Sequence, residues 1–299
     1  MKHKLANRDE GAGLSSARLL GCQVNKVTIP KAVDTIEGWV VEQDREICKF
    51  VVATGFHGLW EAQKSAAFKE VLNSADLFCP DGIAPVWLSR LQRDQLPERV
   101  PGPDLLAEFV ARANRAGYRS FFLGDTEETL RRLEARLRDR FPGHKTVGRF
   151  APPFRRLSET EELEIVKMIN DARPDVLWVA LGLPKQEWWI YRNRERLRVP
   201  VAVAVGAAFG FVSGRVRRAP KWIGRAGFEW VWRLAMEPRK LWRRDLIDGP
   251  QFLFRALSES VGLFKSHDAA PAITEQSGVE SRCAVPEFEP TEMTVGHRL

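Results

Sequence analysis

Short apolar runs that alternate with stretches of helical spacing are the feature that most limits how this chain can fold. Most of the runs are uninterrupted and end in, or just before, a Thr, Pro or Gly. Such runs are typical of strands that are buried on both faces of a sheet. The candidate strands are Ile47–Ala53, Leu77–Pro80, Ser120–Gly124, Val176–Gly182 and Pro200–Gly206.

The segments between these runs carry apolar residues at helical spacing. One helical face spans residues 105–113 and a second spans 130–141, while Ser158–Glu161 has the pattern of a capping box at the start of a third helix. Strand–helix alternation of this kind predicts an α/β fold. We expect a mostly parallel, Rossmann-like sheet with helices on both faces.

The two ends of the chain differ from this middle region. Residues 1–18 and 263–299 are polar and lack periodicity, so they bury too little apolar surface to offset the entropy of ordering them. We therefore predict disordered tails at both ends, an α/β catalytic domain over 19–218, and a basic amphipathic helical appendage over 219–262.

Positive charge is concentrated in that appendage. Between Arg215 and Arg244 ten basic residues face two acids, a local net charge of +8 against +7 for the whole chain. Trp and other apolar residues recur at helical spacing in the same segment, which suits an anionic membrane surface. With no signal peptide or membrane-spanning run predicted, we expect residues 215–254 to bind the membrane peripherally, although a merely solvated basic face would look the same.

Several chemistries are disfavoured because their motifs are absent from the sequence. There is no GxxxxGK[ST] loop, no GxGxxG after a strand, no GxSxG elbow and no HExxH. The four cysteines are scattered, and no Asp-x-Asp pair is present to hold a divalent cation against phosphate. We therefore expect neither a cofactor nor a metal, and phosphate would have to be neutralised by Arg, Lys or helix N-termini.

Ligands of open α/β sheets bind beyond the carboxyl ends of the strands. Each candidate strand is followed there by a loop that contains glycine, and several of these loops add a polar side chain. The loops are Thr54–Gly58, Pro80–Gly82, Gly124–Asp125, Gly182–Glu187 and Gly206–Ala208.

These loops, taken with three further motifs, resemble the WecG/TagA/CpsF glycosyltransferase family from about Gly21 to about Leu257. The further motifs are Arg99–Asp104, Arg218–Pro220 and Glu229–Arg239. The resemblance implies inverting, metal-independent transfer of a sugar, typically N-acetylmannosamine, from UDP to a polyprenyl-diphosphate-linked sugar. It also implies bacterial surface polysaccharide synthesis on the cytoplasmic face of the cell membrane, with undecaprenyl diphosphate as the lipid.

The resemblance assigns catalytic roles to two residues at strand ends. Asp81 falls where the family's proposed base lies, and Thr54 matches a strand-end Thr that orients donor or acceptor. From the residues alone, a simple turn is the favoured interpretation of Asp81-Gly82, and a helix N-cap is an alternative role for Thr54. His57 is an alternative base, although a His beside glycines is more often a loop group.

The resemblance also implies a set of substrate-binding residues. Arg99 and Gln186 match positions that line the nucleotide-sugar cleft, with a surface salt bridge and a helix-start hydrogen bond as the plainer interpretations. Backbone amides at Gly124 and Gly206 would approach the nucleotide, unless these glycines only form tight turns. In the appendage, the residues implied to touch the UDP diphosphate are Arg233, Lys240 and Arg243.

Two positions depart from many relatives. Phe56 stands where Asn is common, and Gly210 where Asp is common, which puts sugar recognition and nucleotide contacts in question. Donors such as UDP-glucose or a UDP-uronic acid therefore stay open, as does a homo-oligomer. A basic nucleic-acid-binding protein is a weaker alternative because it leaves the glycine-bearing strand ends unexplained, and a nicotinamide enzyme lacks its fingerprint. We expect no nucleic-acid partner.

Overall fold

The computed structural model describes residues 14–220, 223 and 229–260 of the chain. All of them belong to one compact unit. Residues 1–13 and the predicted tail over 263–299 lie outside the described residues, so the prediction of disorder there stays a prediction.

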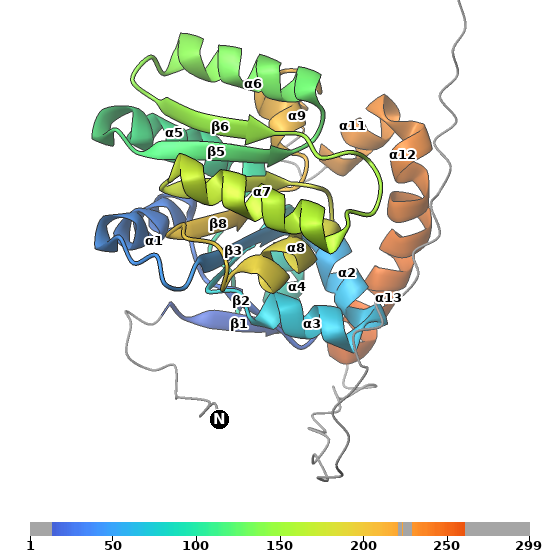
Figure 1. Ribbon diagram of the computed structural model, residues 1–299. Coiled ribbons are helices and arrows are strands. Elements are labelled where there is room, and N and C mark those ends of the chain that lie inside the picture. Colours follow the sequence, from blue (N-terminus) through green and yellow to red (C-terminus); the bar gives the residue numbers. More distant parts are fainter. Residues whose placement is uncertain (1–13, 221–222, 224–228, 261–299) are drawn as a thin grey trace, which may run out of the picture. The chain divides into compact units, whose positions relative to one another are not determined.

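A six-stranded, all-parallel sheet forms the centre of the fold (Figure 1). It confirms the predicted mostly parallel sheet and contains the five predicted strands and a sixth, Lys145–Phe150, that was not predicted. Its order is β4-β3-β8-β7-β5-β6. After β3 the chain continues to β4 at one edge of the sheet, whereas it enters β8 from β7 on the other side. The strand order therefore reverses between β3 and β8. Folds of this kind bind ligands at such a switch point. The strands are β3 Lys49–Thr54, β4 Leu77–Pro80, β5 Arg119–Gly124, β6 Lys145–Phe150, β7 Val176–Ala180 and β8 Val201–Ala204.

Helices cover both faces of this sheet, which confirms the predicted layers. Alternate residues of every strand of this sheet except β6 enter two separate hydrophobic cores. In β3, Phe50 and Val52 join the first core with α2, α3, α4, α7 and α8, and Val51 and Ala53 join the second with α1, α5, α6 and α9. These helices are α1 Ile29–Glu42, α2 Phe56–Lys64, α3 Ala66–Asn73, α4 Ile83–Leu91, α5 Gly102–Ala116, α6 Glu127–Arg140, α7 Glu159–Ala172, α8 Lys185–Asn193 and α9 Ala208–Val212. The predicted capping box is present at Ser158 and Glu161.

A small antiparallel hairpin precedes the sheet, made of β1 Ser16–Leu19 and β2 Cys22–Asn25. The prediction that the disordered tail extends to residue 18 is therefore wrong for residues 16–18. Ala17 and Leu19 are buried in the first core, and their burial stabilises the strand. The turn has positive φ at both Leu20 and Gly21, and a Leu in that position hides the usual hairpin signal.

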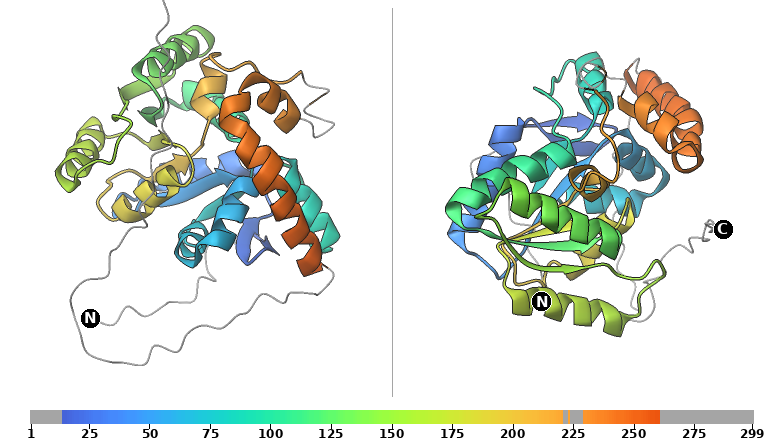
Figure 2. Two further views of the ribbon diagram at one scale, coloured as in Figure 1. Left: turned by 90° about the vertical axis from the view of Figure 1, so that its right-hand side faces the viewer. Right: turned by 90° about the horizontal axis from the view of Figure 1, so that it is seen from above.

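The basic segment folds into consecutive helices (Figure 2), of which the last two pack on α2. They are α11 Glu229–Met236, α12 Pro238–Arg243, the π-helix η1 Arg244–Asp248 and α13 Gly249–Ser260. Phe252 and Ala256 of α13 are buried in the first core. In the described part of the chain no helix has both the length and the apolar character needed to cross a bilayer.

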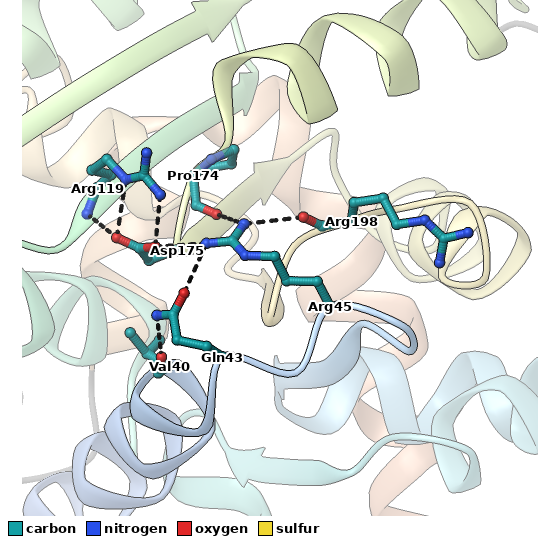
Figure 3. Close-up of polar contacts among 7 residues, drawn as sticks. All are labelled: Val40, Gln43, Arg45, Arg119, Pro174, Asp175 and Arg198. Atoms are coloured by element: carbon teal, nitrogen blue, oxygen red, sulfur yellow. Dashed lines mark hydrogen bonds and ion pairs between the residues drawn. The ribbon is translucent and has the colours of Figure 1, made fainter.

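A polar cluster ties the strands together at their amino ends, away from the strand-end loops (Figure 3). Asp175, just before β7, accepts hydrogen bonds from the Arg119 backbone amide (2.9 Å) and from the guanidinium groups of Arg119 and Arg45. Arg45 also donates to the carbonyl oxygens of Pro174 and Arg198. This cluster holds the amino ends of the strands together and includes no residue of the strand-end loops.

Replacing Asp175 by Ala should therefore lower stability without altering the site. Hydrogen bonds to charged groups contribute roughly 1.5–3 kcal/mol, so urea denaturation should show a loss of that order in the free energy of unfolding. Asp171→Ala is the control, since its pair with Lys167 lies on an exposed helix surface and such pairs contribute little to stability. Equal losses in the two variants would contradict this interpretation.

Candidate active site

The two predicted catalytic residues lie side by side at the carboxyl edge of the sheet. Thr54 ends β3 and Asp81 follows β4, and the Asp81 backbone amide donates a 3.0 Å hydrogen bond to the Thr54 carbonyl oxygen. Thr54 is buried and does not cap α2, whose N-cap is Gly55 without a side-chain hydrogen bond. The N-cap interpretation of Thr54 is therefore wrong.

The Asp81 carboxylate lies at the start of α5. Its Oδ2 accepts a 3.4 Å hydrogen bond from the backbone amide of Gly102, the first residue of that helix. A side chain at Gly102 would come within 2.8 Å of the Val205 carbonyl oxygen, so only glycine lets α5 approach this closely. The carboxylate is thereby held by the positive end of a helix.

Opposing effects set the protonation of Asp81. Burial raises its pKa to about 6; the Gly102 hydrogen bond lowers it, Glu229 raises it, and Arg233 and Arg99 lower it. Taken as a whole, the residue is half-buried. A carboxylate with a pKa near the working pH is well suited to accept a proton.

Arg99 is engaged by the appendage. Its Nη1 donates a 2.7 Å hydrogen bond to Glu229 Oε2 in α11, and Glu229 also lies 3.6 Å from Arg218 Nε. Arg218 in turn pairs with Asp104 in α5. The plainer interpretation of Arg99, a salt bridge, thus describes this structure, and the bridge fastens α11 beside Asp81.

Gln186 is buried in the first turn of α8 and is held at both ends of its amide. Its Oε1 accepts from the Gly206 backbone amide (3.1 Å) and its Nε2 donates to Glu187 Oε1 (2.8 Å). Gly206 follows β8 with a φ of 56°, and Gly124 ends β5 with a φ of 119°. Gly206 lies in a turn, whereas Gly124 is still part of the strand, where a side chain would collide with the Ala180 carbonyl.

Two arginines of the appendage face inward, and only one of them is a predicted site residue. Arg233 in α11 is half-buried, with its guanidinium 5.2 Å from the centre of the Phe211 ring, and its buried Nε has no hydrogen-bond partner among the described residues. Burial, followed by the charge of Arg244, lowers the pKa of Arg233. Arg233 therefore lies near Arg244 and near Asp81.

Arg243 is exposed, whereas its neighbour Arg244 is half-buried. Arg244 lies 5.7 Å from the Phe56 ring centre and pairs with Asp245 at 2.6 Å. The π-helix η1 begins at Arg244, and a change of helical register was not visible in the sequence spacing. The side chain of Lys240 lies outside the described residues.

The two residues that depart from the family pattern, Phe56 and Gly210, each lie in close contact with a neighbouring part of the chain. Phe56 packs against Phe252 of α13, with ring centres 5.8 Å apart, so it joins α2 to the appendage. A side chain at Gly210 would come within 3.2 Å of Val216, so the chain there is packed too closely for Asp without a shift. His57 is half-exposed beside Glu61, at 3.5 Å.

Comparison with known proteins points in one direction. Residues 17–266 match the Glycosyl transferase WecG/TagA/CpsF family. A relative from Bacillus spizizenii is 31% identical over 218 residues, 73% of this chain and 82% of the relative. A relative from Staphylococcus aureus (strain MW2) is 26% identical over 83% of this chain and 94% of its own length. Each is named an N-acetylglucosaminyldiphosphoundecaprenol N-acetyl-beta-D-mannosaminyltransferase.

Proposed function

The chain belongs to the WecG/TagA/CpsF glycosyltransferase family, and from that premise we propose that it transfers N-acetylmannosamine or a related hexose from a UDP-sugar to an undecaprenyl-diphosphate-linked acceptor. The observation that carries the proposal is the Asp81 carboxylate, half-buried at a strand end and flanked by arginines. The names of the relatives supply the acceptor and the sugar. UDP-glucose and UDP-uronic acids are the alternative donors.

The reaction is a single displacement with inversion at the anomeric carbon. Asp81 accepts the proton of the acceptor hydroxyl while that oxygen forms a bond to the anomeric carbon of the donor sugar. The bond from that carbon to the UDP oxygen breaks, and its electron pair leaves with UDP. Thr54 lies next to the base and would orient a substrate, as the backbone contact between the two residues supports.

Charge that develops on the departing diphosphate needs cations that are already in place. Arg233 is half-buried and has an unpaired Nε, so it is available to a phosphate oxygen in surroundings where such a contact is strong. Arg99 approaches from the α5 side and Arg244 from η1. We propose that these groups, with Lys240 and Arg243, do the work that a divalent cation does elsewhere.

The appendage also has the composition of a membrane-binding surface. Trp230, Trp242, Leu246, Leu253 and Phe254 are all at least 40% exposed on its helices. The same helices expose Arg239 and Arg243, and basic residues near an anionic surface contribute roughly 1 kcal/mol each. We propose peripheral binding to the cytoplasmic face of the cell membrane, where the lipid acceptor lies.

The direct test combines the purified protein with a panel of UDP-sugars and a soluble GlcNAc-diphosphate-lipid analogue. Mass spectrometry should detect a disaccharide product and UDP, with UDP-N-acetylmannosamine the best donor. Efficient transfer from a different UDP-sugar would correct the proposed donor and would still support the proposed reaction. Release of UDP without a disaccharide, or no consumption of any donor, would overturn the proposed function.

Transfer should continue when divalent cations are removed. The proposed neutralisation of the diphosphate uses arginines, and the sequence has no Asp-x-Asp pair. Rates measured in EDTA and in added Mg²⁺ or Mn²⁺ should therefore agree within about twofold. A rate that disappears in EDTA and returns with Mg²⁺ would contradict the roles given to Arg233 and Arg99.

A further inference from the structure

Glu187 is a buried carboxyl group that the transfer mechanism does not use. It lies in the first turn of α8, is 0% exposed, and accepts a hydrogen bond from Gln186 on Oε1. Its other oxygen, Oε2, has no hydrogen-bond partner in the described part of the chain. Burial raises the pKa of Glu187 to about 7. A buried carboxyl that is half unpaired is destabilising, so a structural role alone does not account for it.

The contact that Glu187 does make determines which way the Gln186 amide points. The Gly206 backbone amide is a donor, so it requires the carbonyl oxygen of Gln186 to face it, as observed at 3.1 Å. The NH₂ group then needs an acceptor on the opposite side, and Glu187 Oε1 supplies it at 2.8 Å. Without Glu187 the buried NH₂ group would lose its partner, and the reversed amide would set two donors against each other at Gly206.

The Gly206 turn is in contact with the residues that hold the base. Val205, the residue before Gly206, places its carbonyl against Gly102, where an added side chain would lie 2.8 Å from the Val205 oxygen. Gly102 in turn donates its backbone N–H to Asp81 Oδ2. A continuous series of contacts therefore runs from Glu187 through Gln186 and the β8 turn to the carboxylate of Asp81.

We propose that Glu187 is a positioning residue for sugar transfer: it orients the Gln186 amide, which pins the Gly206 turn that supports α5 and the base. The inference rests on the proposed function. Its effect should appear mainly in kcat, because the contacts end at the base. A misplacement of about 1 Å can slow an enzyme roughly 10²-fold, so a loss of about 10- to 100-fold is expected when the orientation is lost.

The test compares Glu187→Leu with Glu187→Gln. Leu removes the acceptor of the Gln186 NH₂ group, so kcat should fall about 10- to 100-fold. The loss of a buried, half-unpaired carboxyl offsets the cost of the NH₂ group left without a partner, so unfolding in urea should change little. Gln keeps an acceptor oxygen for Gln186 and should restore most of the lost turnover. A residue with only a structural role would show the opposite pattern, with stability and turnover falling together in Glu187→Leu.

Two further variants, Gln186→Leu and the double variant Gln186→Leu/Glu187→Leu, test the same inference without relying on the folding of a single variant. If Glu187 acts through Gln186, Glu187→Leu should have little further effect on turnover in the Gln186→Leu background. Additive losses, or wild-type turnover in either single Leu variant, would overturn the inference. Failure of the parent protein to transfer any sugar would instead overturn the proposed function, so the two failures are distinguishable.

Discussion

Replacing Asp81 by Asn is expected to lower the rate of sugar transfer by ~10²–10⁴-fold, the usual contribution of a general base. Asn keeps an oxygen that can accept the hydrogen bond from Gly102, but it cannot take the proton of the acceptor hydroxyl. Since the variant also removes a buried charge, its fold should not be weakened. The measurements are single-turnover transfer, UDP binding by calorimetry, which should change little, and urea unfolding.

The matched control is Asp94→Asn, a change of the same kind at a surface pair with Lys26. Its transfer rate should stay within about twofold of the parent, as expected for a surface substitution. The parent enzyme supplies a second check: because burial raises the pKa of Asp81 to about 6, transfer should rise as the pH passes upward through about 6 and then level off. Near-parental transfer by Asp81→Asn would exclude Asp81 as the base.

Replacing Arg233 by Ala should slow transfer roughly 10- to 150-fold, even on a short water-soluble acceptor without membranes. A buried charge-assisted hydrogen bond contributes roughly 1.5–3 kcal/mol, and this one would be strongest to the diphosphate as it departs. Arg233 is half-buried near Asp81, so its loss acts on the chemistry. The loss should appear in kcat, measured at saturating donor.

Arg239→Ala is the control for Arg233, because Arg239 is an exposed arginine of the same appendage. It should leave transfer to the soluble acceptor unchanged. Flotation with anionic liposomes should respond only slightly to either change, since membrane affinity sums over many residues. Normal transfer by Arg233→Ala together with impaired flotation would exclude a catalytic role for Arg233 and would indicate that the appendage only binds the membrane.

The central sheet could be predicted because its strands are buried on both faces and so read as apolar runs. The strands that escaped prediction are the polar ones. β6 lies at the sheet edge and includes Lys145 and Arg149, and no residue of it is fully buried. β1 and β2 are only four residues each, and their pairing depends on a turn with an unusual Leu20.

The site could be predicted less fully than the sheet. Parallel strands bring their carboxyl ends to one edge, and that rule is enough to place Asp81 and Thr54 at the same edge of the sheet. That they lie side by side depends on the pairing of β3 with β4, which the sequence did not predict. The partners of Arg99 and Gln186 are Glu229 and Gly206, which are 130 and 20 residues away in the sequence. No local pattern specifies such pairs. The inward turn of Arg244 in place of Arg243 likewise depends on the π-helix, which forms only in the folded chain.

The position of Phe56 has a consequence for building hybrid enzymes. Its ring meets Phe252 and Arg244, while the neighbouring Trp60 donates a 3.2 Å hydrogen bond to Asp248. Helix α2 and the C-terminal helices are thus matched to each other across residues almost 200 positions apart. A C-terminal segment taken from a relative with Asn at the position of Phe56 would arrive without a partner for this ring. Functional chimaeras should therefore exchange α2 and the appendage as one unit.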